Sequence, residues 1–422
     1  MTFIDKHNIP PKTPVGFINN ILPFILGLMP ILSIVFDEKL VPLYIIILLI
    51  SYLFEKDKKA NFVKNKRYLL PFVIMISVFV IFTLVSSDIL LSLKVLERQI
   101  SFILLPLLVF TADWSRKRLI VFLKTFTFGL SIFCLISFGL LIWFYITNQD
   151  WIVTMNQMQN NGTYLLFKFP HLVNTHPTYW SYLLIFGNII VLSNYFFFFF
   201  KGKYIGLLML LIFNTIILLL ASRTPLVINI LVFISTFTLL FKYSRKYSNK
   251  KLLLMGVVVL GLVVFVAPNI NLLKIKTADS FNDDRFYLWP IALDQIKNNY
   301  YVLGEGLGLG NSMLKEYIIE NGDMRKNYNS FDLHNQYLRH YLDMGILGLG
   351  SLVYFIFSPL MFKRNVFYSP DSFLTISLVL LLSLACITEA PLYRLKGIVV
   401  FSIFYPIFLI AGDNLKLRKE IV

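Results

Sequence analysis

The sequence predicts an all-α polytopic membrane protein with about twelve transmembrane helices and a small helical cap on the outer face. Hydrophobic residues make up 57% of the 422 positions and the mean hydropathy is +0.72, whereas a soluble domain is about 45–50% apolar. Apolar stretches of roughly 20 residues recur along the chain, and helices of that length cross the hydrocarbon layer with their backbone polar groups satisfied. We therefore expect one membrane bundle rather than a string of soluble domains.

The first predicted span, 17–36, follows a short polar leader and is too long for the core of a signal peptide. The remaining predicted spans are 40–54, 68–86, 99–112, 119–147, 178–200, 204–221, 225–241, 252–268, 341–361, 372–388 and 395–411. Three regions follow from them. Residues 1–268 hold the first nine spans with an outer loop at 148–177, residues 269–340 form the large outer loop, and residues 341–422 hold the last three spans and a tail.

Positive charge sets the predicted orientation. More than half of the 39 Lys and Arg lie in residues 1–16 and in the short segments 55–67, 113–118, 201–203, 242–251, 362–371 and 412–422. The positive-inside rule puts these segments and both termini in the cytoplasm. The net charge of +16 then reflects topology. The large loop has nine acids and eight bases and no basic face with aromatic stacking sites, which argues against a nucleic-acid partner.

Arg223 is the first candidate for chemistry. It stands in Ser222-Arg223-Thr224, between two apolar spans at the outer edge of the bundle. An arginine there is costly unless it reaches the interface or meets an anion. Two interpretations remain open: an interfacial anchor, or a guanidinium that holds a phosphate bidentately.

The large loop contains a second candidate, Arg285, four residues before Trp289. This spacing is typical of a pair on one helix face, and it also fits a binding site. A glycine run at 304–310 follows, in which Gly306 and Gly308 would allow close backbone approach to a ligand. No strand-turn-helix unit surrounds these glycines, so they do not indicate a dinucleotide fold. Short helices are expected on either side of the run, at 294–299 and 314–319.

His334 is the third candidate, at the point where the loop enters the tenth span. Asp332 is expected to cap that helix, which would put His334 in its first turn, with Asn335 and Tyr337 beside it. A histidine there titrates near neutrality and can act as a general base, although an interfacial histidine is also compatible with a purely structural role.

Further outer-face residues are candidates for secondary contacts. His176 and Tyr179 enter the sixth span from the outer side, where contact with lipid headgroups explains them nearly as well. Lys94 and Arg98 lie four residues apart on a short amphipathic piece after the third span. Cys134 and Cys386 fall inside predicted spans, and no Asp-x-Asp pair or His/Cys cluster has metal-ligand spacing. No metal site and no cofactor are predicted.

Taken together, these motifs resemble the O-antigen ligase and polymerase superfamily of bacterial envelopes. The resemblance rests on the order and spacing of 222–224, 285–289, 304–311 and 334–338, followed by 343–349. It covers roughly residues 204–361 by motif and the rest by span count. It implies a fold similar to GT-C-type lipid-linked glycan transferases. Twelve spans with the large loop between the ninth and tenth look like the ligase arrangement.

This resemblance implies a metal-independent glycosyltransferase of the bacterial inner membrane. A glycan would pass from an undecaprenyl diphosphate carrier to an acceptor hydroxyl at the periplasmic face, with inversion at the anomeric carbon. His334 would orient or deprotonate the acceptor, and Arg285 and Arg223 would bind the diphosphate. The expected substrate contacts are Lys94, Arg98, His176, Tyr179, Trp289, Gly306, Gly308, Asn335 and Tyr337.

Three other functions remain open. In a ligase the acceptor is lipid A–core, whereas in a polymerase it is another carrier-linked repeat. A polysaccharide transporter usually places ionisable residues at the bilayer midplane, and apart from Lys124 the midspan positions here are almost wholly apolar. A non-catalytic scaffold would not require cations and histidine on one face.

Overall fold

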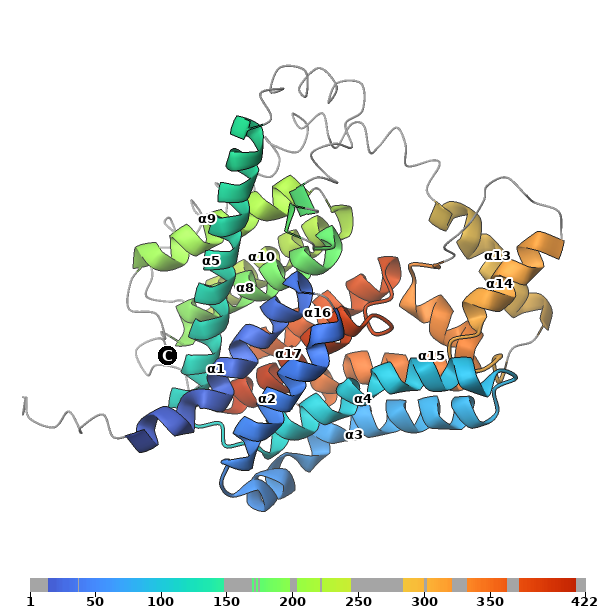
Figure 1. Cartoon of the computed structure of the whole chain (residues 1–422), viewed down its shortest axis with the longest axis horizontal. Helices are drawn as coiled ribbons and strands as arrows, with labels where there is room; N and C mark the ends of the chain where they lie inside the picture. The colour runs from blue at the N-terminus through green and yellow to red at the C-terminus, as the bar shows by residue number, and fades with distance from the viewer. Residues whose placement is uncertain are drawn as a thin grey trace, which may run out of the picture.

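The protein is described by a computed structural model for residues 14–36, 38–147, 169–170, 172–173, 175–197, 203–220, 222–243, 284–299, 302–320, 332–362 and 372–414. Every regular element in this part of the chain is a helix (Figure 1), as predicted. The elements are α1 (Pro14–Val35), η1 (Glu38–Leu40), α2 (Val41–Leu53), α3 (Lys58–Leu84), α4 (Ile89–Thr111), α5 (Arg116–Thr147), α8 (Pro177–Phe197), α9 (Lys203–Leu220), α10 (Arg223–Tyr243), α13 (Asp284–Asn299), α14 (Gly310–Glu320), α15 (Gln336–Met361), α16 (Phe373–Thr388) and α17 (Leu395–Asn414).

Apolar helices dominate the described chain. Four are long and apolar enough to cross a bilayer: Lys58–Leu84, Arg116–Phe144, Gln336–Met361 and Leu395–Gly412. Shorter apolar helices cover Asn20–Val35, Tyr204–Leu220, Arg223–Thr238 and Phe373–Thr388. The predicted span 252–268 lies outside the described residues, and each of the other predicted spans overlaps a helix. The count of twelve crossings stays a prediction.

The helix α17 lies at the centre of the bundle. Of its most apolar window, 89% is buried inside the protein, and it packs against α4, α16 and α1. Around it, α3 packs on α4 and α15, and α8 packs on α9 and α10. Stacked and edge-on aromatic rings fill the space between them, such as Phe186 on Phe404 with centroids 4.1 Å apart.

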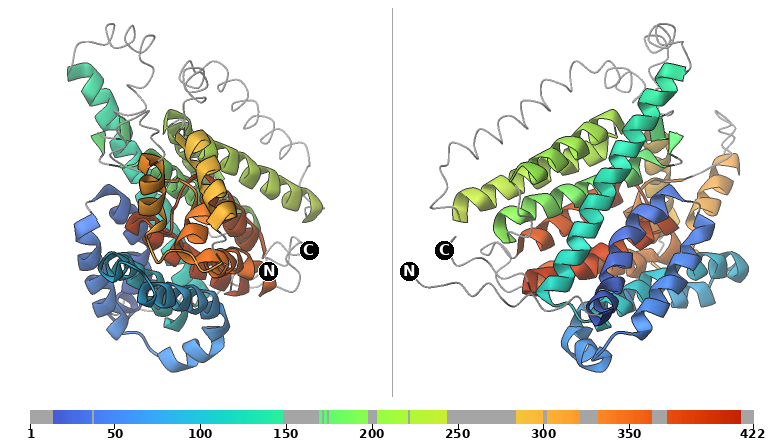
Figure 2. Two further views of the ribbon diagram at one scale, coloured as in Figure 1. Left: turned by 90° about the vertical axis from the view of Figure 1, so that its right-hand side faces the viewer. Right: turned by 60° about the vertical axis from the view of Figure 1, so that its left-hand side comes forward.

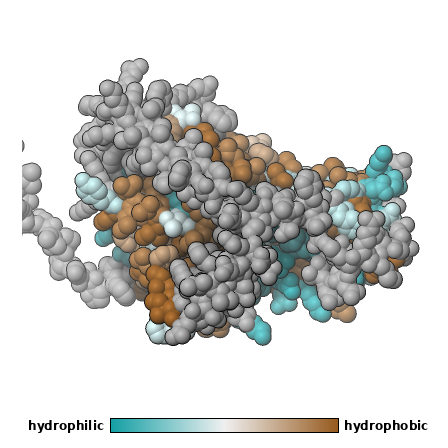
Figure 3. Space-filling view, turned by 90° about the horizontal axis from the view of Figure 1, so that it is seen from above, coloured by the Kyte–Doolittle hydropathy of each residue, from teal (hydrophilic) through white to brown (hydrophobic). Residues whose placement is uncertain are grey.

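Large apolar side chains also cover the outside of the bundle. Leu53, Leu84, Leu90 and Ile146 are each at least 68% exposed, and brown side chains line much of the coloured surface in Figure 3. Apolar surface on this scale would be unfavourable in water. It suits a helix bundle surrounded by lipid. Hydrophilic side chains gather at the end that carries α13 and α14.

The helices α13 and α14 form a cap on α15 (Figure 2, left). They share a small apolar core with the start of α15, separate from the main one. Its buried members are Leu288, Ala292, Leu314, Ile318, Leu333 and Leu342. Both cap helices were predicted, but each is longer than the six residues expected from the sequence.

The glycine run between the cap helices inserts into the backbone of α15. Gly345 has φ +59° and ψ −152° and interrupts the helix. The Ile346 amide therefore donates to the Val302 carbonyl oxygen at 3.1 Å, while the Leu342 carbonyl oxygen accepts from the Glu305 amide at 3.1 Å. The loop thus takes over hydrogen bonds that a continuous helix would make with itself. This arrangement ties the cap to the bundle.

We expect Gly345→Ala to destabilise the protein by about 2–4 kcal/mol, because a side chain there is strained at positive φ and would overlap the Val302 carbonyl group. Gly350→Ala, on the same helix, is the matched control because a Cβ at that position meets nothing within 4 Å. Thermal unfolding of the detergent-solubilised variants measures the difference. Equal midpoints for the two variants would contradict this account of the loop.

Candidate active site

His334 lies in a short loop that leads from the cap into α15. Its φ of +46° is a left-handed conformation that costs a non-glycine residue free energy. The His334 amide donates a hydrogen bond to Asp332 Oδ1 at 3.2 Å. The indole of Trp289 donates to the Leu333 carbonyl oxygen at 2.8 Å. These bonds hold the backbone that carries the imidazole at the junction of cap and bundle.

Two expectations about this loop are wrong. Asp332 does not cap α15, because Asn335 takes that position and its side chain accepts a hydrogen bond from the Leu338 amide at 3.1 Å. Asparagine at the N-cap satisfies an amide that the first helical turn leaves without a partner. His334 consequently precedes the helix instead of lying in its first turn.

A buried carboxylate joins His334 to Arg285. Glu389 directly follows α16 and its side chain is only 9% exposed. Its Oε2 lies 3.2 Å from His334 Nδ1, and its Oε1 lies 3.6 Å from a terminal nitrogen of Arg285. The structure thus brings together His334 and Arg285, two of the three residues predicted to be catalytic. The residue that joins them, Glu389, was not singled out from the sequence.

Glu389 also determines the state of the imidazole. The hydrogen bond to Glu389 raises the pKa of His334 above its ordinary value. Because Nδ1 faces the carboxylate, Nε2 is the ring nitrogen left to face a substrate. A carboxylate on one imidazole nitrogen orients the ring and makes the other nitrogen a stronger base. About a third of the His334 side chain is exposed, so a substrate can reach it.

The loop before α15 and the turn after α16 are joined by a second set of contacts. Asp332 pairs with Arg394 at 2.7 Å and with Arg339 at 3.6 Å. The Arg339 guanidinium lies 3.9 Å from the centroid of the Tyr393 ring, and the Tyr393 hydroxyl donates a hydrogen bond to Asp343. These pairs hold the segment that carries His334 against the segment that carries Glu389.

Two buried glutamines hydrogen-bond to the backbone of the turn that follows Glu389. The Leu392 amide donates to Gln336 Oε1 at 3.0 Å. The Leu392 carbonyl oxygen accepts from Gln99 Nε2 at 2.9 Å. Both glutamines are fully buried. Side chains from α4 and α15 therefore position Glu389 from two directions.

Three predicted substrate contacts have structural roles in this region. Asn335 caps α15, the Trp289 indole binds the loop backbone, and the Tyr337 hydroxyl donates to the Ser383 carbonyl oxygen at 3.0 Å. The glycines Gly306 and Gly308 are likewise buried by packing, since added side chains would meet the α3–α4 turn and α4 within 2.7 Å. Substrate contacts for these residues stay a prediction.

His176 and Tyr179 lie near the same turn. Their rings are 5.4 Å apart at the start of α8. The Tyr179 ring packs against Gly397, where an added Cβ would lie 3.0 Å from it. Gly397 is three residues after Arg394, so the ring lies close to the turn that follows Glu389. The buried Tyr179 hydroxyl has no hydrogen-bond partner among the described residues. A role for both in substrate binding stays a prediction.

The other predicted cations lie on exposed faces. Arg223 is the first residue of α10, and α10 packs against α16, the helix that leads into Glu389. Lys94 and Arg98 are exposed on α4, which is one continuous helix from Ile89 and not the separate amphipathic piece expected. Convergence of these three cations with Arg285 on one substrate stays a prediction.

Sequence reasoning missed Glu389, Arg394 and Arg339. A signal for the first two was present, because they are the charged residues of the short linker 389–394 between two apolar segments. Charged side chains next to membrane-spanning segments are costly unless they are paired. Their partners lie more than fifty positions away in the chain.

Long apolar helices, a helical cap, and an imidazole and a guanidinium sharing a buried carboxylate define a membrane protein with a polar site beneath its cap. The family model described as O-antigen ligase matches residues 207–353. This match confirms the resemblance found in the sequence: over residues 207–353 the chain is similar to the O-antigen ligase family. The matched range contains Arg223, Arg285 and His334, and Glu389 lies beyond it. No curated protein matches the chain.

Proposed function

We propose that this chain transfers a glycan from an undecaprenyl diphosphate carrier to an acceptor hydroxyl at the periplasmic face of the inner membrane. The proposed acceptor is lipid A–core. The observation that carries the proposal is the contact of Glu389 with both His334 and Arg285. It puts a potential general base and a phosphate-binding cation around one buried carboxylate, and glycan transfer from a diphosphate needs both.

The proposed reaction is a single displacement. His334 Nε2 accepts the proton of the acceptor hydroxyl while its oxygen attacks the anomeric carbon. The bond from that carbon to the diphosphate oxygen breaks, and the electron pair leaves with the diphosphate. Attack from the face opposite the leaving group inverts the anomeric centre. Glu389 keeps the ring oriented and stabilises the imidazolium that forms.

Arg285 is proposed to stabilise the leaving diphosphate. Guanidinium groups bind phosphate bidentately and keep their charge at any physiological pH. The Arg285 side chain is 30% exposed, so the group is partly accessible. Arg223 is proposed as a second cation for the diphosphate, which fits its place at the start of a helix packed on α16.

Reconstitution tests this function. Proteoliposomes containing the purified chain and a carrier diphosphate-linked glycan should form product with lipid A–core, including after treatment with EDTA. A second carrier-linked repeat, offered alone, tests the polymerase alternative. If no product forms with either acceptor, the chain does not transfer the glycan. If product forms without EDTA but not with it, the mechanism is not metal-independent.

The Glu389–His334 contact predicts a pH effect. Only neutral His334 can accept a proton, so kcat/KM should fall as the pH drops through its raised pKa. Glu389→Gln removes the carboxylate, lowers that pKa towards its ordinary value of about 6.5, and should shift the acidic limb of the profile to lower pH with a smaller maximum. Lys315→Ala, an exposed change on α14, should leave the limb in place. If the acidic limb of the kcat/KM profile does not shift in Glu389→Gln, His334 is not the general base.

A further inference from the structure

A second polar region lies at the other end of the helices that hold the candidate active site. The helix α17 begins beside Arg394 and ends at Asn414, and its 20 residues span about 30 Å. The helix α3 meets the glycine loop near its carboxyl end, where the Phe82 carbonyl oxygen accepts from the Leu307 amide at 3.3 Å. Asn61, near its amino end, lines a pocket together with Asn414. The pocket therefore lies about one hydrocarbon thickness from the site.

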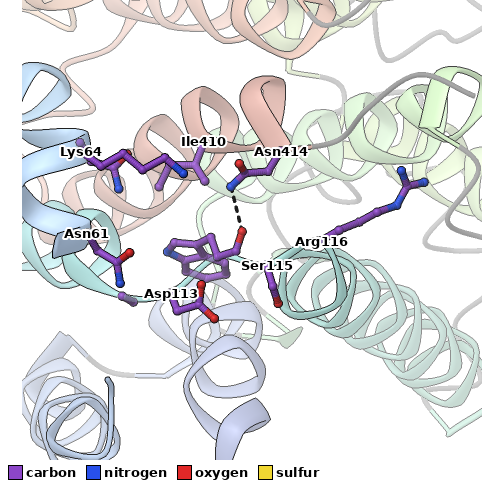
Figure 4. A pocket seen from close by; sticks show the side chains of 10 residues that line it. Asn61, Lys64, Asp113, Ser115, Arg116, Ile410 and Asn414 are labelled. Carbon is purple, nitrogen blue, oxygen red and sulfur yellow. Dashed lines mark hydrogen bonds between the residues drawn. The ribbon is translucent and has the colours of Figure 1, made fainter. Parts of the chain in front are cut away.

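This pocket is formed where the start of α3, the turn between α4 and α5, and the end of α17 meet, and its volume is about 270 Å³. Figure 4 shows Lys64 and Asn61 on one side, Ser115 and Asn414 on the other, and Arg116 extending outward. The Lys and Arg distribution assigns this end of the bundle to the cytoplasm. A ligand here would therefore come from the cytoplasm or the inner leaflet.

Two acceptor groups of the pocket lining lie close to donors. The Trp114 carbonyl oxygen accepts from Asn414 Nδ2 at 2.8 Å. The Asp113 carboxylate lies 3.7 Å from the Arg118 guanidinium, which also pairs with Glu55, and two lining cations, Lys64 and Arg116, outnumber this one lining acid. By contrast, the buried Asn61 Nδ2 has no hydrogen-bond partner among the described residues. A buried donor left unmatched is costly. The pocket lining therefore has one amide donor, Asn61 Nδ2, without a partner among the described residues.

The charge of the pocket favours an anion. Lys64 supplies an ammonium group, and the amino-terminal end of α5 adds the partial positive charge of a helix terminus. Ala112, Trp114 and Ile410 give the pocket an apolar wall. We propose that this pocket binds a phosphate group on the membrane face opposite the candidate active site. The phosphate belongs either to an anionic phospholipid headgroup or to a soluble phosphate.

Native mass spectrometry of the full chain with added phosphatidylglycerol or phosphatidylcholine tests the lipid source. Wild-type protein should retain phosphatidylglycerol preferentially, and Lys64→Ala should lower its affinity about tenfold, as expected for one charge-assisted hydrogen bond. Asn61→Ala should weaken it as well. The matched control is Lys59→Ala, an exposed lysine on α3 outside the described lining, which should behave as the wild type.

The soluble source is tested by thermal unfolding in inorganic phosphate against chloride at equal ionic strength. Stabilisation by phosphate that is lost in Lys64→Ala but kept in Lys59→Ala supports the pocket as a site for soluble phosphate. Retention of phosphatidylglycerol with the same Lys64 dependence supports the lipid. If Lys64→Ala and Lys59→Ala behave alike in both experiments, the proposal is wrong.

Discussion

His334→Ala is expected to lower the transfer rate by about 10²- to 10⁴-fold, the range that general base catalysis contributes. The acceptor hydroxyl then has no base at the position where the structure holds Nε2. Binding of the carrier diphosphate should change little, because the predicted phosphate ligands are untouched. Single-turnover transfer in proteoliposomes, with donor binding measured in parallel, separates the two effects.

Imidazole in solution distinguishes a lost base from a damaged fold. The cavity left by His334→Ala lies beside the buried carboxylate of Glu389, so added imidazole should occupy it and restore part of the rate. A structural role for His334 predicts no such rescue and a lower unfolding temperature. Full activity of His334→Ala without imidazole would rule out the base assignment.

Arg285→Ala should weaken binding of the carrier diphosphate about 10- to 100-fold, as expected when a charge-assisted bidentate contact is lost. Arg285→Lys should recover only part of it, because an ammonium group lacks the planar fork. Lys297→Ala, exposed in the last turn of the same helix, is the control and should bind normally. Donor affinity, measured by titration in detergent, provides the comparison.

Arg285 has a second expected effect, on the pH profile. Its charge lowers the pKa of His334, against the larger raising effect of the Glu389 hydrogen bond. Removing the charge should therefore shift the acidic limb of kcat/KM to higher pH, opposite to the shift expected for Glu389→Gln. Unchanged donor affinity and an unchanged limb in Arg285→Ala would exclude Arg285 from the site.

The helices themselves were largely predictable from hydropathy. The predicted segments 372–388 and 395–411 nearly coincide with α16 and α17. The starts of α3 and α4 were placed ten residues too late, because charged residues continue each helix beyond its apolar stretch. Hydropathy locates the part of a helix that suits the hydrocarbon layer, whereas the backbone hydrogen bonds extend into the polar interface.

The candidate site was only half predictable. His334 was found because it lies where the large loop enters an apolar span, and Arg285 because it lies four residues before Trp289 and shortly before the glycine run. Glu389 was missed because its role depends on two side chains packed against it from distant parts of the chain. The break at Gly345 was also missed, since it arises when the glycine loop takes over hydrogen bonds of α15.

A structure of the reconstituted protein with an unreactive carrier diphosphate analogue tests the central claim most directly. We expect the diphosphate against the Arg285 guanidinium, with the anomeric carbon facing the side of the imidazole that points away from Glu389. A diphosphate bound beyond hydrogen-bond reach of Arg285, with His334 still held by its carboxylate and facing no substrate, would contradict the proposed active site.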